Sequence, residues 1–323
     1  MRFFPLAQWI EDHHDAPHNL SRSGMRGALR SVPRLLRGFP PATEDDLRNA
    51  LARRNGVPPD RLFLTHGASE GNALATTFLA GHIRGKSGRA PKFWAPTPEY
   101  PPLFDLAPTV GFRRVAERES ADLVVVSDPN NPTGEPSPVW AEAAPASSRV
   151  SVLVDETFRD FSRVPRRGPG EGPGLWRTGT FTKVYGGDDV RVGYVIAPEP
   201  ALRDFAQFHS LALDRIAPWS IGAAMAIHRH REEVLRESRG IFQANLRELR
   251  EQVDDVPRLA APLWFDRVPD GDAVERRAIR NGILVCSGSY FGDRRGVRIC
   301  LTRRSFPRDL AAYLAVRERA SPP

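Results

Sequence analysis

The chain has 323 residues, of which 41% are hydrophobic and 26% charged, and this predicts a globular protein with one sizeable core and a smaller second lobe. Its net charge of +7 comes mainly from scattered arginines, which indicates composition rather than nucleic-acid binding. No apolar run is long enough to cross a membrane. The two cysteines, Cys286 and Cys300, lack the spacing of a metal site or disulfide framework, which favours a reducing cytoplasm.

The first two thirds of the chain alternate between predicted helices and apolar strands. A helix is expected from Thr43, a good N-cap, to Asn55, because Gly56 then ends it. A strand at 61–64 leads through a glycine turn into a helix near Ser69, and further strands are expected at 92–95, 123–127, 152–155, 179–182 and 192–197. These strands are apolar throughout, as in strands covered on both faces. The pattern predicts an α/β fold with a largely parallel sheet.

The pattern changes after about residue 206. A long helix is expected from 221 to 253, followed by strands at 259–265, 283–286 and 297–301 that alternate with helices. These elements predict a smaller α+β lobe. The glycine- and proline-rich stretch at 163–174 is expected to form a surface loop. We therefore predict a large domain over 37–205 and a small domain over 206–323.

Four polar segments each follow a predicted strand, which is where open parallel sheets place their ligands. The segment 65–71 combines small residues with a helix start, a combination that suits phosphate. The segment 127–134 presents the amide of Asn131 to a ligand oxygen. Asp155 ends an apolar strand, as a helix cap or as the partner of a cation. A carboxylate beside a pyridine nitrogen keeps that nitrogen protonated and strengthens the ring as an electron sink.

The fourth segment, 179–194, contains Lys183, one of only three lysines in the chain beside Lys86 and Lys92. A lysine held away from water has a lowered pKa and can attack an aldehyde. Together the four segments supply what pyridoxal 5′-phosphate (PLP) requires: a phosphate cradle, a group for the phenolic oxygen, a carboxylate for the ring nitrogen and an amine for the aldehyde. We predict a PLP enzyme with a Schiff base at Lys183 that acts on an amino acid.

On these motifs the chain resembles the class I/II aminotransferases of the aspartate aminotransferase fold (PLP fold type I), and within them the histidinol-phosphate aminotransferase branch. The resemblance covers about residues 19–305. It implies a large domain with a mostly parallel sheet flanked by helices, a small α+β domain, and an N-terminal segment, 1–36, that joins the small domain and the substrate site. It also implies a homodimer with the site at the subunit interface, acting on amino acids and 2-oxo acids.

The resemblance also implies a role for individual residues. Lys183 would bind the cofactor and shuttle a proton between the substrate Cα and a cofactor carbon. Arg298 would clamp the substrate α-carboxylate as a bidentate pair. The remaining implied cofactor contacts are Ala68, Ser69, Thr180 and Arg191 for the phosphate, Tyr100 stacked on the ring, Asn131 for the ring oxygen, and Asp155 for the ring nitrogen.

Three departures from the family pattern bear on the reaction. Phe158 replaces a tyrosine beside the ring oxygen, Phe39 replaces a tyrosine that reaches the partner's phosphate, and Asp189 replaces a glycine. We expect an aminotransferase, with a decarboxylase like threonine-phosphate decarboxylase, a lyase or a cyclase as the alternative. A PLP-sensing regulator is disfavoured, because the segment before the PLP-binding part is too short for a DNA-binding domain. Arg22, Arg26 and Arg30 are candidates for recognising a substrate phosphate or carboxylate.

Overall fold

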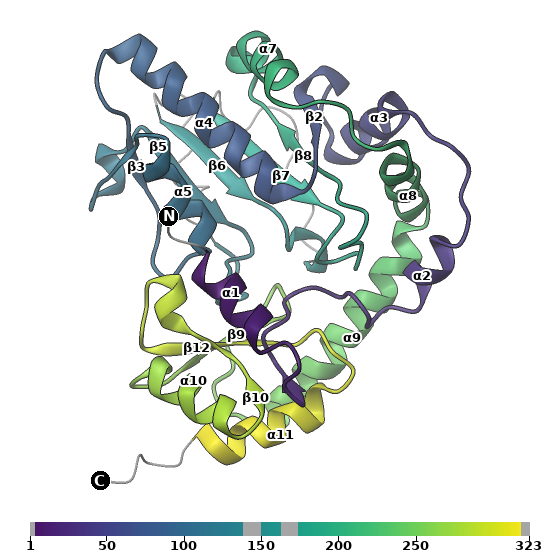
Figure 1. Ribbon diagram of the computed structural model, residues 1–323, viewed down its shortest axis with the longest axis vertical. Coiled ribbons are helices and arrows are strands. Elements are labelled where there is room, and N and C mark those ends of the chain that lie inside the picture. The colour runs from purple at the N-terminus through teal and green to yellow at the C-terminus, as the bar shows by residue number, and fades with distance from the viewer. Residues whose placement is uncertain (1–3, 138–149, 163–173, 318–323) are drawn as a thin grey trace.

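A computed structural model describes residues 4–137, 150–162 and 174–317. The molecule has two parts, a large sheet covered by helices and a smaller part built on a short sheet, and the long helix α9 runs from one toward the other (Figure 1). Most of the expected surface loop at 163–174 lies outside the described residues. Among the residues described, no helix is long and apolar enough to cross a membrane.

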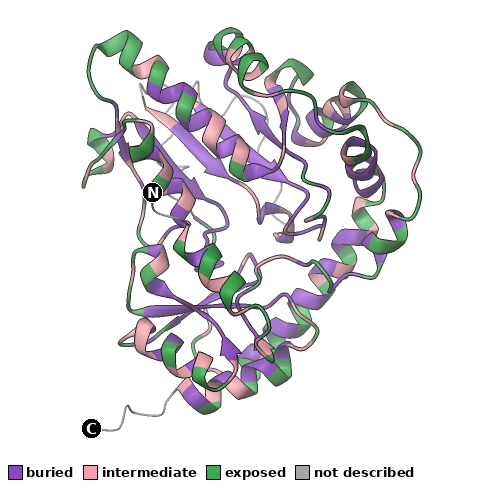
Figure 2. Cartoon of the chain, in the orientation of Figure 1, coloured by how far each residue is buried: buried purple, intermediate pink, exposed green. Residues whose placement is uncertain are grey.

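The large sheet has seven strands in the order β2-β8-β7-β6-β5-β3-β4. Every neighbouring pair is parallel except the two pairs that β8 makes, with β2 and with β7. The central strands β5, β6, β7 and β8 are almost fully buried (Figure 2), as in parallel strands covered on both faces, whereas the edge strand β4 is exposed. Their bounds are β2 Leu62–Thr65, β3 Lys92–Trp94, β4 Arg113–Arg114, β5 Leu123–Ser127, β6 Ser151–Asp155, β7 Leu175–Thr180 and β8 Gly193–Ile196.

Helices cover the large sheet, and α4 lies across β7 and β8 (Figure 1). The helix predicted from Thr43 is present, with a capping box in which the Thr43 hydroxyl accepts from the backbone N–H of Asp46 and the Asp46 side chain accepts in return. Gly56 ends it in the left-handed conformation, φ 64°, as predicted. The helices of this part are α3 Glu44–Asn55, α4 Ala68–Ser87, α5 Pro101–Thr109, α7 Leu202–Ala212 and α8 Pro218–Arg229.

The smaller part contains an antiparallel sheet in the order β11-β12-β9. The N-terminal segment reaches this part, because β1 pairs with β10 in parallel. The bounds are α1 Pro5–Asp12, β1 His18–Asn19, α2 Ser31–Leu35, α9 Arg231–Gln252, β9 Leu263–Arg267, α10 Gly271–Arg280, β10 Ile283–Leu284, β11 Cys286–Ser287, β12 Gly296–Cys300 and α11 Phe306–Arg317. The domain boundaries after residues 36 and 205 stay predictions.

The predicted fold class is confirmed, whereas several element bounds were wrong. The long helix at 221–253 is two helices that meet at His230, whose φ of −101° and ψ of 17° break the helix without a glycine or proline to signal it. The strand expected at 259–265 begins only at Leu263, after Pro262. The strand expected at 179–182 is β7, which ends at Thr180. The stretch 283–286 holds parts of two strands that pair with different partners.

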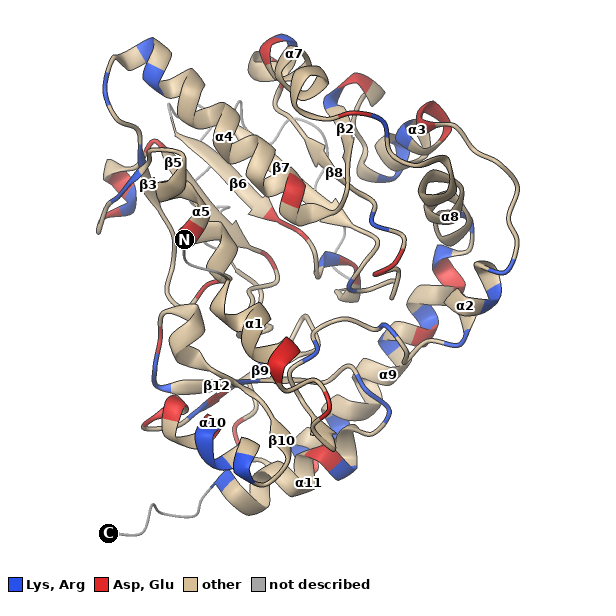
Figure 3. Cartoon of the chain, viewed as in Figure 1, with Lys and Arg blue, Asp and Glu red and all other residues tan. Residues whose placement is uncertain are grey.

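Basic and acidic residues are interspersed along the helices of both parts (Figure 3). This distribution matches the scattered arginines of the sequence and differs from the single basic stripe that a nucleic-acid-binding face presents. That the protein binds no nucleic acid stays a prediction.

Candidate functional site

A cavity of about 110 Å³ lies where the polar segments after β2, β5, β6 and β7 meet. These strands run parallel, so their carboxyl ends share one edge of the sheet. All the residues that the sequence assigned to the cofactor line this cavity, namely Ala68, Ser69, Tyr100, Asn131, Asp155, Phe158, Thr180, Lys183 and Arg191. Sequence reasoning therefore brought together residues that are up to 123 positions apart (191 − 68). Their individual roles stay predictions.

The first turn of α4 forms one end of the site cavity. Gly67 precedes the helix with φ 113°, a conformation that glycine adopts without steric cost. A Cβ placed on Gly67 would lie 3.6 Å from Nη2 of Arg191 and 3.8 Å from Oγ1 of Thr180. The guanidinium, a hydroxyl and the unpaired N–H groups of a helix start thus face the same space. This combination fits a phosphate.

Asp155 is the last residue of β6 and is buried. Its carboxylate accepts hydrogen bonds from Asn72 Nδ2 at 2.8 Å and from the backbone N–H of Thr157 at 2.9 Å. Thr178 in turn donates to Asn72 at 2.7 Å and fixes the orientation of its amide. Burial raises the pKa of Asp155 despite these bonds. A desolvated carboxylate of this kind is stabilised by a cation placed beside it, such as a protonated ring nitrogen.

Lys183 lies three residues after β7 and lines the cavity. Burial lowers the pKa of its amine, and the negative charge of Asp188 partly opposes this shift. A lowered pKa increases the neutral fraction of the amine at physiological pH, which is the form that attacks a carbonyl.

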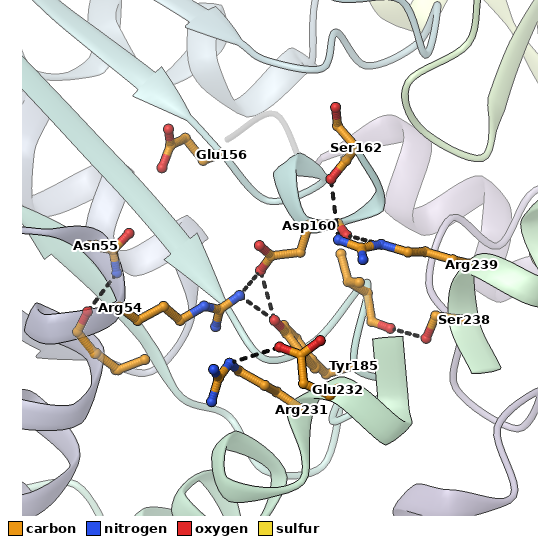
Figure 4. Close-up of polar contacts among 12 residues, drawn as sticks. Arg54, Asn55, Glu156, Asp160, Ser162, Tyr185, Arg231, Glu232, Ser238 and Arg239 are labelled. Atoms are coloured by element: carbon orange, nitrogen blue, oxygen red, sulfur yellow. Dashed lines mark hydrogen bonds and ion pairs between the residues drawn. The ribbon is translucent and has the colours of Figure 1, made fainter. Parts of the chain in front are cut away.

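The loop that carries Lys183 is anchored from behind by a polar cluster (Figure 4). Arg54, from α3, donates to both Asp160 and the Tyr185 hydroxyl, and that hydroxyl donates to Asp160 at 2.8 Å. Ser238, from α9, donates to the carbonyl of Val184 at 2.6 Å. The cluster connects α3, the segment after β6, α9 and the lysine loop. Nothing in the sequence pattern signalled it, because each member comes from a different element.

Arg298 lies at the centre of β12 and is buried, with an exposure of 2%. Its Nη1 donates to Oδ1 of Asn131 at 3.1 Å, and its Nη2 donates to the carbonyl of Ser21 at 2.9 Å. The guanidinium lies over the ring of Phe291, 4.8 Å from its centre. Arg298 is therefore placed directly behind a residue that lines the cavity, but it is not itself part of the lining.

Two aromatic residues line the cavity. Burial raises the pKa of Tyr100 to about 12, so its hydroxyl is neutral at physiological pH. Phe158 is 3% exposed and stacks on Phe161 with a centroid distance of 6.4 Å. Phe39, by contrast, lies away from the cavity and contacts the ring of Trp219 edge-on at 5.9 Å.

The arginines proposed for substrate recognition do not line the cavity. Arg22, Arg26 and Arg30 are all exposed, and Arg26 forms an ion pair of 2.9 Å with Asp189. Asp189, which stands where the family pattern has a glycine, is itself exposed, with a side-chain accessibility of 67%.

Several residues of the site were missed by sequence reasoning. Those that also line the cavity are Ser23, Gly67, Ser127, Thr157, Thr182 and Asp188. Most belong to the four motif segments, so their position in those segments was the available signal. Glu99, next to Tyr100, supports the lining from behind, because its carboxylate accepts from the backbone N–H groups of both Tyr100 and Ser127. Burial raises the pKa of Glu99 to about 8.

The family model for aminotransferase class I and II matches residues 14–305. The chain belongs to this family. The family is PLP-dependent, so the cofactor is PLP, and the anion cradle at Gly67, the desolvated Asp155 and the low-pKa amine of Lys183 fit its phosphate, ring nitrogen and aldehyde.

Individual relatives carry different activities. The chain is 24% identical over 322 residues to histidinol-phosphate aminotransferase from Halorubrum lacusprofundi, covering 93% of this chain and 86% of the relative. It is 26% identical over 357 aligned positions to capreomycidine synthase from Streptomyces vinaceus, covering 95% and 92%. The solved structure of the PLP-dependent cyclase OrfR superposes with a TM-score of 0.77 at 20% identity, covering 99% of this chain and 98% of that one. This last likeness shows the fold.

Proposed function

We propose that the protein is an aminotransferase that moves an amino group between an amino acid and a 2-oxo acid. The observation that carries the proposal is the amine of Lys183, with its lowered pKa, in one cavity with Asp155, Asn131 and Arg191. When bound, PLP withdraws electrons from the substrate Cα. The low-pKa amine of Lys183 would hold and move the Cα proton. Asp155 would keep the ring nitrogen protonated.

The other lining residues bind and orient in this proposal. The phosphate is held by Ala68, Ser69, Thr180 and Arg191, and Asn131 donates its amide to the ring oxygen. Tyr100 and Phe158 contact the ring, the first by stacking. Arg298, directly behind Asn131, is assigned to the substrate α-carboxylate, and its buried Nε has no hydrogen-bond partner among the described residues.

The alternative is a decarboxylase, lyase or cyclase on the same scaffold. The departure that favours it is Phe158, which lines the cavity without the hydroxyl expected there. Which bond at Cα breaks depends on which one stands perpendicular to the ring. A screen of amino acids against the holoenzyme would follow loss of the visible absorption, keto-acid formation and carbon dioxide release. Keto acid formed with consumption of a 2-oxo acid supports transamination, and carbon dioxide without keto acid supports a decarboxylase. Keto acid formed without consumption of a 2-oxo acid, or a spectral change with neither product, supports a lyase or cyclase. No change with any amino acid contradicts both proposals.

We further propose a cytoplasmic homodimer. Both cysteines are free and buried, which agrees with a reducing compartment. Trp219 is 50% exposed and packs on the partly buried Phe39, and an exposed tryptophan of this kind is suited to an interface core. Sedimentation of the holoenzyme at twice the chain mass would support the dimer, whereas a monomer at micromolar concentration would contradict it.

A further inference from the structure

Another hollow, of about 560 Å³, lies between α3, the end of α8 and the start of α9, and it shares no lining residue with the site cavity. We call it the arginine pocket, because the charged side chains that line it are mostly arginines. Its titratable lining consists of Arg53, Arg54, Arg229, Arg231, His228 and Asp46. A hollow of this size is in the range of small-molecule sites.

Two arginines of the pocket, Arg53 and Arg229, are exposed and unpaired. Neither forms an ion pair or hydrogen bond with any residue that the structure describes. The carboxylate of the lining, Asp46, is already engaged, because its Oδ2 accepts from the backbone N–H of Thr43 at 2.9 Å and from the Thr43 hydroxyl at 2.8 Å. These hydrogen bonds lower the pKa of Asp46 most, and the charge of Arg229 adds a smaller effect from a distance. The two guanidinium charges are therefore left open to an anion.

The two paired arginines add to the positive surroundings of His228. Arg54 donates to Asp160 (Figure 4), and Arg231 lies 3.3 Å from the exposed Glu232. Burial, together with the charges of the nearby arginines, lowers the pKa of His228 to about 4. The imidazole is therefore neutral at physiological pH. The arginines outweigh the opposing charge of Asp160 at this position, so the potential there is positive.

Helix stability does not account for all of these arginines. Arg53 and Arg54 lie in the last turn of α3, and Arg229 ends α8, where cations interact favourably with the helix dipole. Arg231, however, is the first residue of α9, and the positive end of a helix dipole disfavours a cation. A ligand that neutralises the assembled charges would account for this placement.

The arginine pocket is separate from the surface that we propose for the dimer. Trp219 lies near the start of α8 and Arg229 at its end, about 15 Å apart along the helix axis. On its inner side the pocket reaches the lysine loop, because Arg54 also donates to the Tyr185 hydroxyl. A ligand can therefore occupy the pocket in the dimer and with the cofactor in place.

The lining also indicates the class of anion. A phosphate group carries nearly two negative charges and three acceptor oxygens, so one group can pair with both unpaired arginines, and guanidinium forks match its geometry. Apolar lining is limited to Ala50 and Met225, and the described lining contains no aromatic side chain to stack on a base. We propose that the arginine pocket binds a small, non-aromatic phosphate compound through Arg53 and Arg229.

The test is calorimetric titration of the holoenzyme with pyrophosphate and with inorganic phosphate at constant ionic strength. Because the cofactor occupies the phosphate cradle of the site cavity, the visible absorption, followed in parallel, should not change. We expect both anions to bind, pyrophosphate more tightly because it carries more charge. Arg53→Gln and Arg229→Gln should each weaken binding by about 10-fold or more, since each removes a charge-assisted pair. Both residues are exposed, so the variants should fold and keep the visible band.

Arg250→Gln is the matched control, because Arg250 is also exposed and also lies in the last turn of a helix, α9. It lowers the net charge by the same amount and should leave the affinity unchanged. The proposal is overturned if the holoenzyme binds neither anion, or if Arg250→Gln weakens binding as much as the pocket variants do. Loss of the visible band on addition of pyrophosphate would place the anion at the cofactor cradle instead. Tighter binding of citrate than of pyrophosphate would overturn the phosphate class.

Discussion

Lys183 differs from Lys86 in its burial, and this difference predicts its reactivity. Burial lowers the pKa of Lys183, whereas Lys86 is exposed. A lowered pKa means that the amine loses its proton at a lower pH, so Lys183 should react with PLP already at neutral pH.

The measurement is borohydride reduction of the apoprotein with PLP at a series of pH values, followed by peptide mapping. We expect label on Lys183 at pH 7. Label at pH 7 on Lys86 or Lys92 in place of Lys183 would contradict the assignment of the site.

Phe158 offers a second prediction at the residue scale. In the family pattern a tyrosine at this position donates a hydrogen bond to the ring oxygen and stabilises the anionic form of that oxygen. The neighbouring imine nitrogen then holds its proton less tightly. Phenylalanine cannot donate, so Asn131 is left as the donor that we assign to this oxygen. The visible band of this protein should therefore persist to a higher pH than in relatives with tyrosine. Phe158→Tyr should lower the midpoint.

A pH titration of the visible band in both proteins decides this prediction. Phe158 is buried against Phe161, so the added hydroxyl needs a partner in the cavity to be accommodated. An unchanged midpoint in a variant that still binds the cofactor would mean that residue 158 does not face the ring oxygen.

At the scale of elements, the sequence predicted the site better than it predicted the element bounds. Buried parallel strands are mainly apolar, so a polar residue at the end of an apolar run marks the sheet edge, as Asp155 does at the end of β6. That signal is local and could be found in the sequence. The break at His230 and the late start of β9 depend on tertiary packing, which the local pattern does not contain.

The cluster around Arg54 likewise depends on contacts between distant elements. It predicts that two substitutions in α3, Arg54→Met and Arg48→Met, differ in how much they lower the stability of the protein. Arg54 is paired with Asp160 in a half-buried setting, with side-chain exposures of 12% and 16%. Arg54→Met removes the cationic partner of Asp160 and leaves it with the Tyr185 hydroxyl as the remaining donor of the cluster, so it should destabilise the protein by about 3 kcal/mol. Arg48 pairs with Asp45 at the surface, and Arg48→Met should cost less than about 1 kcal/mol.

Urea unfolding of the two variants measures the two losses of stability. Cofactor titration measures a further expected effect, on PLP binding. Because Tyr185 belongs to the Arg54 cluster and lies two residues after Lys183, Arg54→Met should also weaken PLP binding. Equal stability of the two variants would contradict the anchoring role of the cluster.

At the scale of the whole molecule, Arg298 joins three separate parts of the fold. It comes from the small sheet, donates to Ser21 in the N-terminal segment and donates to Asn131 after β5 of the large sheet. The site is therefore completed only when both parts and the N-terminal segment are packed together. The motif containing Arg298 was visible in the sequence, but its contact with Asn131 was not, because 167 residues separate the two.

Arg298→Ala should leave the cofactor attached and weaken binding of the amino acid. Loss of a charge-assisted pair with a buried partner costs roughly 2–5 kcal/mol, which corresponds to about a 30-fold or larger rise in the dissociation constant. Arg298→Lys should restore little, because a point charge cannot reproduce the planar fork.

Arg298→Ala also removes the contacts to Asn131 and Ser21, so a structural effect must be separated from loss of carboxylate binding. The matched pair for this purpose is an amino acid and the amine that lacks its carboxylate. If Arg298 binds the carboxylate, Arg298→Ala weakens the amino acid far more than the amine, and the spectral titration shows the two affinities converging. Equal weakening of both ligands would assign Arg298 to the packing of the two parts and place the carboxylate site elsewhere.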